Sequence, residues 1–181
     1  MGSPAKRIAT YADIEALPAG VNGEIVDGEL FVSPRPAMPH ALVGSSIGVE
    51  IGGPFWKGRG GPGGWVIVYE PELHLGADVL APDWAGWRRE RMPENTEVVP
   101  DWVCEILSPS TARLDRVRKM PVYAREKVPH VWIVDPALQT LEVYRLEEHG
   151  YVLVMSAAEA EKVRAEPFDA IELDLASLWG R

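Results

Sequence analysis

The sequence predicts a mixed α/β domain. Short apolar segments rich in Val, Ile, Leu and Trp recur along the 181 residues, as β-strands require. Between these apolar segments lie longer ones that begin with polar residues typical of a helix N-terminus. With 46% hydrophobic residues the chain can fill one well-packed core, so we expect a single domain over residues 1–181 with its core at about 24–156.

The first two elements are a short helix and a hairpin. Thr10 followed by Asp13 resembles a helix N-cap pairing, which predicts a helix over 11–17. The dipeptide Asp27-Gly28 suits a tight turn between two apolar segments, so residues 24–32 are expected to form a β-hairpin.

A proline-rich connection follows the hairpin and leads into an expected helix over about 40–51. The glycine-rich stretch 52–64 is expected to be a flexible loop, since it lacks the strand-to-helix setting and the Gly-Lys-Ser/Thr ending of a phosphate loop. Apolar or alternating segments then predict strands at 65–69, 72–75 and 78–81, with Pro82-Asp83 as a strand end.

The second half of the chain begins with a polar segment, 88–100, which is expected to be a loop. Residues 102–107 are bulky on both faces, as in a central strand. Ser110 or Thr111 can cap a helix to about residue 126, which Pro121 should interrupt or kink. Further apolar segments predict strands at 131–134, 141–146 and 151–155 and a helical turn or two at 174–179.

Charge and composition exclude several classes of protein. The net charge of −9 opposes tight nonspecific DNA binding, although nine basic residues lie between Trp84 and Lys127, where a modest basic surface competes with a solvated mixed-charge face. The single cysteine, Cys104, excludes an internal disulfide and a Cys-based zinc cluster. No apolar run has transmembrane length and residues 1–10 lack a signal-peptide core, so we expect a cytoplasmic protein without a membrane partner.

Glu105 is the most informative residue. Val103 and Leu107 share its face of the expected strand, and an ionised carboxylate among such neighbours is costly unless it is paired or bound to a metal. One interpretation is an ion pair with Arg113 or Arg116, and the other is a metal site.

Two further residues favour the metal site. Asp83 follows Pro82 at the expected strand end, and Lys119 lies in the helix after Glu105. Hard divalent cations bind carboxylate oxygens, and a lysine can position the attacking water or stabilise a developing negative charge. A metal-dependent phosphodiesterase needs both functions. Asp83 alone is weak, because Pro-Asp is also a common turn dipeptide.

The order of these residues resembles the PD-(D/E)XK nuclease superfamily. The lysine expected two positions after the acid is absent, and Lys119 on the next helix stands in the alternative place that some members use. A longer run resembles a restriction-endonuclease family that was formerly catalogued as a domain of unknown function. It comprises Pro100-Asp101-Trp102-Val103-Cys104-Glu105-Ile106-Leu107-Ser108-Pro109-Ser110-Thr111, then Asp115, Lys119 and Tyr123, and Val131-Trp132-Ile133-Val134-Asp135-Pro136.

The resemblance implies a restriction-endonuclease-like fold, with a mixed central β-sheet flanked by helices. It implies that Asp83 and Glu105 hold Mg²⁺ or Mn²⁺, with the Ile106 backbone carbonyl as a further ligand, and that Lys119 orients the attacking water or stabilises the phosphorane. Glu24 matches an N-terminal acid of the family pattern and is a further candidate ligand. A solvent-facing glutamate at a hairpin edge is the competing interpretation.

Lys119 and the accessory candidates have structural alternatives. Asp115, Lys119 and Tyr123 are spaced four apart and can form an ordinary Asp-Lys-Tyr row along a helix. His40 matches a family position at a helix start, where it can touch substrate or metal or serve only for capping and packing.

The expected function is therefore a metal-dependent endonuclease that hydrolyses nucleic-acid phosphodiester bonds by metal-activated water, with DNA as the expected substrate. Cleavage of both strands of a duplex usually takes two active sites, so a homodimer is expected. The alternative is a catalytically inactive nuclease-fold module that binds nucleic acid or a protein partner.

Overall fold

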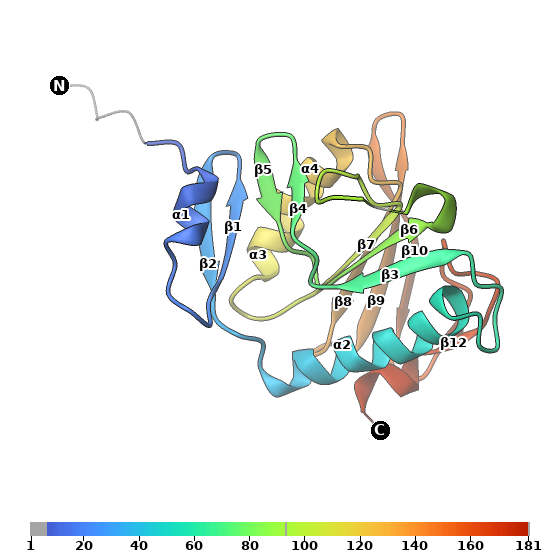
Figure 1. Ribbon diagram of the computed structural model, residues 1–181. Helices are drawn as coiled ribbons and strands as arrows, with labels where there is room; N and C mark the ends of the chain where they lie inside the picture. The colour runs from blue at the N-terminus through green and yellow to red at the C-terminus, as the bar shows by residue number, and fades with distance from the viewer. Residues whose placement is uncertain (1–6, 93, 181) are drawn as a thin grey trace.

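The computed structural model describes residues 7–92 and 94–180, and its main feature is a six-stranded sheet with helices on both sides (Figure 1). The strand order is β10-β9-β8-β7-β6-β3. The strands are β3 (Trp65–Tyr69), β6 (Trp84–Arg88), β7 (Trp102–Ile106), β8 (His130–Asp135), β9 (Thr140–Glu147) and β10 (Gly150–Ala158). β7 and β8 pair in parallel and the other neighbours pair antiparallel, so the sheet is mixed, as predicted.

A four-stranded sheet in the order β2-β1-β5-β4 lies beside the larger one. Its strands are β1 (Asn22–Val26), β2 (Glu29–Ser33), β4 (Leu73–Leu75) and β5 (Asp78–Leu80). The predicted hairpin turn is present, because Asp27 and Gly28 have φ of 50° and 73°, as a two-residue hairpin turn of this hand requires. Two short strands, β11 (Lys162–Val163) and β12 (Leu173–Asp174), form a separate pair that the sequence did not predict.

Four α-helices and four helical turns of other kinds connect the strands of the described chain. The α-helices are α1 (Tyr11–Glu15), α2 (Met38–Glu50), α3 (Ala112–Leu114) and α4 (Met120–Arg125); η1 (Gly52–Trp56) and η3 (Asp115–Lys119) are π-helical, and η2 (Arg89–Arg91) and η4 (Leu175–Trp179) are 3₁₀. The predicted N-cap pairing of α1 is present, since the Thr10 N–H donates to Asp13 Oδ2 at 2.8 Å. No helix within the described part of the chain is long and apolar enough to cross a membrane.

The two faces of the large sheet bury separate apolar clusters, and β7 contributes to both. Trp102, Cys104 and Ile106 pack with α2 on one face, whereas Val103 packs with Val122 of α4 on the other. This is the alternation expected of a central strand. It places the parallel β7 and β8 between two helical layers, with α3, η3 and α4 forming the connection between them.

Three predictions about elements were wrong. Residues 52–64 are not entirely loop, because η1 continues directly from α2. Asp83 does not end β5, which stops at Leu80; it directly precedes β6, a strand that was not predicted. The region expected as polar loop from residue 88 begins with the last residue of that strand.

The helix predicted after β7 is present and is interrupted, because η3 separates α3 from α4. The π-helical turn ends just before Met120-Pro121. This agrees with the expected interruption, since proline cannot donate the hydrogen bond that a regular helix needs there. The expectation about residues 1–10 concerns in part residues 1–6, which lie outside the described part.

Candidate functional site

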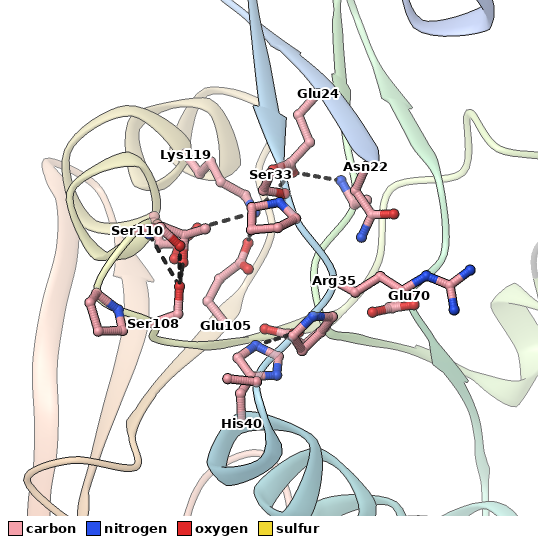
Figure 2. Close-up of a pocket in the computed structure, with 18 residues that line it drawn as sticks. Asn22, Glu24, Ser33, Arg35, His40, Glu70, Glu105, Ser108, Ser110 and Lys119 are labelled. Atoms are coloured by element: carbon pink, nitrogen blue, oxygen red, sulfur yellow. Dashed lines mark hydrogen bonds and ion pairs between the residues drawn. The ribbon is translucent and has the colours of Figure 1, made fainter. Parts of the chain in front are cut away.

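A cavity of about 250 Å³ opens where the hairpin, the segment before β6, the end of β7 and the helical segment α3–η3 meet (Figure 2). Its lining is rich in acids, which come from chain segments far apart in sequence. The titratable residues among those that line it are Glu24, Arg35, His40, Glu70, Asp83, Glu105, Asp115 and Lys119. The three residues that first suggested a phosphodiesterase therefore border one cavity.

Lys119, on η3, places its ammonium among three carboxylates. The Nζ atom lies 2.8 Å from Glu105 Oε1, 2.9 Å from Glu24 Oε1 and 3.3 Å from Asp115 Oδ1. The side chain is only 2% exposed. Burial alone lowers the pKa of Lys119, but the charges of Glu105 and Glu24 outweigh it and raise the pKa well above the usual lysine value. Lys119 is therefore a buried cation held by carboxylates.

Glu105 lies on β7 and is buried, with Lys119 and Tyr123 as its partners. The Tyr123 O–H donates to Oε1 at 2.5 Å. Burial raises the pKa of Glu105 well above its usual range, and the charge of Lys119 counteracts only part of this increase. The predicted alternative of an arginine partner is wrong for Arg116, which pairs with Glu142 at 2.7 Å.

Asp83, between β5 and β6, is tied to β7 and α2. Its Oδ2 accepts the Ile106 N–H at 2.6 Å, and Oδ1 lies 3.0 Å from His40 Nε2. Burial lowers the pKa of His40, but the hydrogen bond and charge of Asp83 more than compensate, so the pKa is raised. These contacts fix the Asp83 carboxylate beside the end of β7, next to Glu105.

His40 also has a ring nitrogen without a partner. Its Nδ1 is buried, with no hydrogen bond to any described residue, while Nε2 faces Asp83. His40 lies near the start of α2, as the sequence predicted, and its contact is with an acid rather than with the helix end.

Glu24 does not face solvent. It is 7% exposed on β1, and its Oε1 accepts the Ala81 N–H at 2.8 Å in addition to contacting Lys119. The alternative of a hairpin-edge glutamate in water is therefore wrong, because the hairpin packs against β5 and turns this side chain inward.

The Asp-Lys-Tyr row expected along the helix is present. Asp115 is 3% exposed and pairs with Lys119, and Tyr123 is fully buried on α4. Burial raises the pKa of Asp115, although Lys119 lowers it in part. Asp115 and Lys119 belong both to the row and to the lining of the cavity, so the structural and the functional interpretations describe one cluster.

The chemistry of the donors fits a hard divalent cation. Four carboxylates, those of Glu24, Asp83, Glu105 and Asp115, line the cavity with the one ammonium of Lys119. Their mutual repulsion contributes to the raised pKa of Glu105, and a bound cation would relieve it. Within residues 7–92 and 94–180, however, no three such side chains already converge on a common metal position. Lys119 occupies the centre of the cluster instead.

Comparison with known proteins places the chain in a family. Residues 8–176 match the family Uma2, which is described as "Putative restriction endonuclease". The chain belongs to the Uma2 family. The match spans almost the whole chain, so it includes every element that borders the cavity.

A solved structure shares the fold of this Uma2 protein. The crystal structure of a "putative nuclease belonging to DUF820" from Anabaena variabilis superposes with a TM-score of 0.69 at 21% sequence identity. The similarity covers 95% of this chain and 98% of the other. The restriction-endonuclease-like fold predicted from the sequence is thereby confirmed. No curated protein matches the chain.

Several residues of the Uma2 cavity were missed by sequence reasoning. Ser108 Oγ lies 3.0 Å from both Ser110 Oγ and Thr111 Oγ1 at the start of α3, and all three hydroxyls border the cavity. Glu70, which follows β3, joins them with Arg35. The sequence did contain a signal for two of them, because Glu70 and Ser108 are polar residues that directly follow an apolar segment.

Proposed function

We propose that this Uma2-family protein is a divalent-metal-dependent endonuclease that hydrolyses phosphodiester bonds of nucleic acid, with DNA as the expected substrate. The observation that most supports this is the position of the Lys119 ammonium, within 3.3 Å of three carboxylates in the cavity that Asp83 also borders. Acids and a lysine together in an accessible cavity provide cation ligands and a positive group for a phosphate.

The proposed roles follow from the contacts. Asp83 and Glu105 would hold Mg²⁺ or Mn²⁺, with the Ile106 carbonyl and Glu24 as further ligands. The bound cation would supply charge neutralisation at the phosphate and a more acidic water. Lys119 would then donate hydrogen bonds to the attacking water or to an equatorial phosphate oxygen as negative charge develops there.

Accessory residues would fix this geometry without touching phosphorus. The Tyr123 O–H holds one oxygen of Glu105, and His40 holds one oxygen of Asp83. The second oxygen of each carboxylate would then be left to bind the cation, although that of Asp83 also accepts the Ile106 N–H. Asp115 would set the position of Lys119 through their ion pair.

The test is cleavage of plasmid DNA, single-stranded DNA and RNA with Mg²⁺ or Mn²⁺. Asp83→Asn and Glu105→Gln should each lower the rate by about 100-fold or more, because each removes a carboxylate that would hold the cation at the reacting phosphate. Glu72→Gln is the matched control, since Glu72 pairs with His74 outside the cavity and the rate should stay unchanged. Circular dichroism and thermal denaturation check that each variant folds. A purified protein that cleaves none of the substrates with either metal would refute the proposal.

One observation favours the alternative of an inactive module that binds nucleic acid or a protein. Lys119 already neutralises part of the acidic cluster, so the fold does not need a metal to bury it. Calorimetric titration with Mn²⁺ separates the two functions. Binding heat that Glu105→Gln abolishes supports the nuclease, and no heat with the wild type supports the module.

Assembly and location stay predictions. A homodimer would bring two cavities to one duplex, and light scattering after size-exclusion chromatography measures its mass. A cytoplasmic location remains the expectation from sequence, and fractionation of expressing cells tests it.

A further inference from the structure

A second cavity, of about 400 Å³, adjoins the acidic one. The two share Glu24, Ser33, Pro34, Ser110 and Thr111 in their walls. The second cavity extends from this shared wall between strand β2 and the helical segment α3–η3. A chain-like ligand with one group in the acidic cavity can therefore continue into its neighbour without leaving the surface.

The walls of the second cavity are apolar and accessible. Phe31 and Val32 of β2 form one side, and Leu114 and Val117 form the other. Val32 is 51% exposed and Val117 is 57% exposed, so these walls are open to a ligand rather than sealed in the core. Flat apolar groups gain most from such a site, because they lose water on entering it.

The second cavity carries both signs of charge, because Glu24 and Glu29 line it together with Arg113 and Arg118. Arg113 is exposed, borders only the second cavity, and forms no ion pair or hydrogen bond with any residue that the structure describes. Arg118 also lines the cavity, with its guanidinium 5.3 Å from the centre of the Phe31 ring, but it is paired with Glu29 and Asp27 and donates to the Val26 carbonyl. Arg113 is thus the cation available to an anionic ligand.

We propose that the second cavity binds the nucleotide next to the scissile phosphodiester of a single-stranded nucleic acid. Its base would pack against Phe31, Leu114 and Val117, and its phosphate would pair with Arg113. The proposal rests on the proposed nuclease function, which places the scissile phosphate in the acidic cavity. A nucleotide combines a flat apolar ring with an anion, which are the two features that these walls and Arg113 match.

The preference for single strands follows from the position of the apolar walls. In an intact duplex both faces of each base are covered by its neighbours, so a base reaches a cavity only after it is unstacked. A single strand presents its bases at little cost. The wild type should therefore bind and cut single-stranded substrate in preference to the same sequence in a blunt duplex.

The test measures fluorescence anisotropy of a labelled single-stranded oligonucleotide, with Ca²⁺ replacing Mg²⁺ so that binding is observed without turnover. Arg113→Ala should weaken binding about 10-fold and reduce the slope of log K against log salt by about 0.7. The matched control is Arg59→Ala, which removes an exposed arginine that borders neither cavity and should leave both quantities unchanged.

A second pair of variants tests the base. Phe31→Leu should weaken binding about 5-fold or more, whereas Phe31→Tyr keeps the ring and should bind like the wild type. On an oligonucleotide made entirely of abasic sites, Phe31→Leu should bind like the wild type. Equal affinities of Arg113→Ala and Arg59→Ala, or equal wild-type affinities for single strand and duplex, would overturn the proposal.

The outcomes for the two proposals can be told apart. If the wild type cuts nucleic acid but the cavity variants match their controls, only the nucleotide-binding cavity is refuted. If the wild type neither binds nor cuts any substrate, the nuclease function fails as well.

Discussion

Replacing Lys119 with methionine would test whether the ammonium holds the acidic cluster together. Met fills most of the lysine volume but carries no charge, so the change removes the contacts to Glu105, Glu24 and Asp115 while the packing is largely kept. What remains is a set of buried carboxylates without a counter-charge.

The magnitude follows from distance and burial. At an effective dielectric constant of about 20, unit charges about 3 Å apart attract by about 5–6 kcal/mol, and the desolvation of both ions offsets a large part of that attraction. Removing one partner of a buried ion pair typically costs about 3–5 kcal/mol. Since whole domains are stable by only about 5–15 kcal/mol, Lys119→Met should be folded but clearly less stable.

The loss should depend on pH with a defined sign. In the native protein the pKa values of Glu105 and Asp115 are raised above their ordinary values of 4.5 and 3.8. The stabilising contribution of such groups is complete below those ordinary values and decreases as pH rises through the native pKa. Without Lys119 these native pKa values rise further, so the gap between wild type and variant should widen from mildly acidic to neutral pH. Because the pKa of Lys119 itself is raised, the wild-type advantage should persist to pH values above its ordinary value of 10.5.

The measurement is urea denaturation followed by tryptophan fluorescence at several pH values. Lys162→Met is the matched control, because Lys162 is 60% exposed and 4.0 Å from Asp174, and the change should alter stability by less than about 0.5 kcal/mol. The double variant Lys119→Met/Glu105→Gln should recover part of the loss, since it removes a charge that the single variant leaves unpaired. A loss below about 1 kcal/mol, or no recovery in the double variant, would refute the argument, because only an exposed pair is worth so little.

Three other predictions concern the scaffold. Phe168→Ala should lower the free energy of unfolding by about 3–5 kcal/mol in the same denaturation assay, because the ring packs against several aromatic neighbours, and a loss below about 1 kcal/mol would contradict this. Those neighbours are Phe55, Trp65, Trp102 and Trp132. Gly48→Ala should destabilise by about 1–3 kcal/mol although alanine favours helices, because its Cβ would lie 2.8 Å from the Trp84 ring, while Gly53→Ala meets no atom within 4 Å and serves as the control. Cys104 should react with a thiol reagent only after unfolding, since burial raises its pKa well above the usual thiol value, and labelling of the native protein would contradict this.

Local sequence patterns were sufficient to predict elements that depend on a few neighbouring residues. The hairpin followed from Asp27-Gly28, and the central strand followed from bulky residues on both faces of 102–107. The strand β6 was missed because Ala85-Gly86 are poor strand formers. They are held in a strand by side chains that are distant in sequence. A Cβ on Gly86 would lie 3.0–3.3 Å from Ile67, Trp102 and Trp65, so glycine leaves the space that these side chains fill.

The candidate site divides in the same way. An acid within an apolar strand was sufficient to identify Glu105, because burying a charge has few low-cost solutions. Nothing near Glu24 indicates that it is buried, since that depends on the pairing of β1 with β5 and on Lys119, which is far away in sequence. The structure brings Asp83, Glu105 and Lys119 to one cavity, while their catalytic roles remain predictions.

The position of Lys119 links folding to the proposed chemistry. The four carboxylates that gather around the cavity exceed the charge of one ammonium, and they come from four separate segments of the chain. A fold that assembles such a cluster stores repulsion that any additional cation would relieve. A cation that binds only the folded state also stabilises it. At concentrations above the dissociation constant, the free energy of unfolding increases with the logarithm of the cation concentration. A metal that serves the proposed reaction would therefore raise the melting temperature of the wild type, and by more in Lys119→Met, where the repulsion is least compensated.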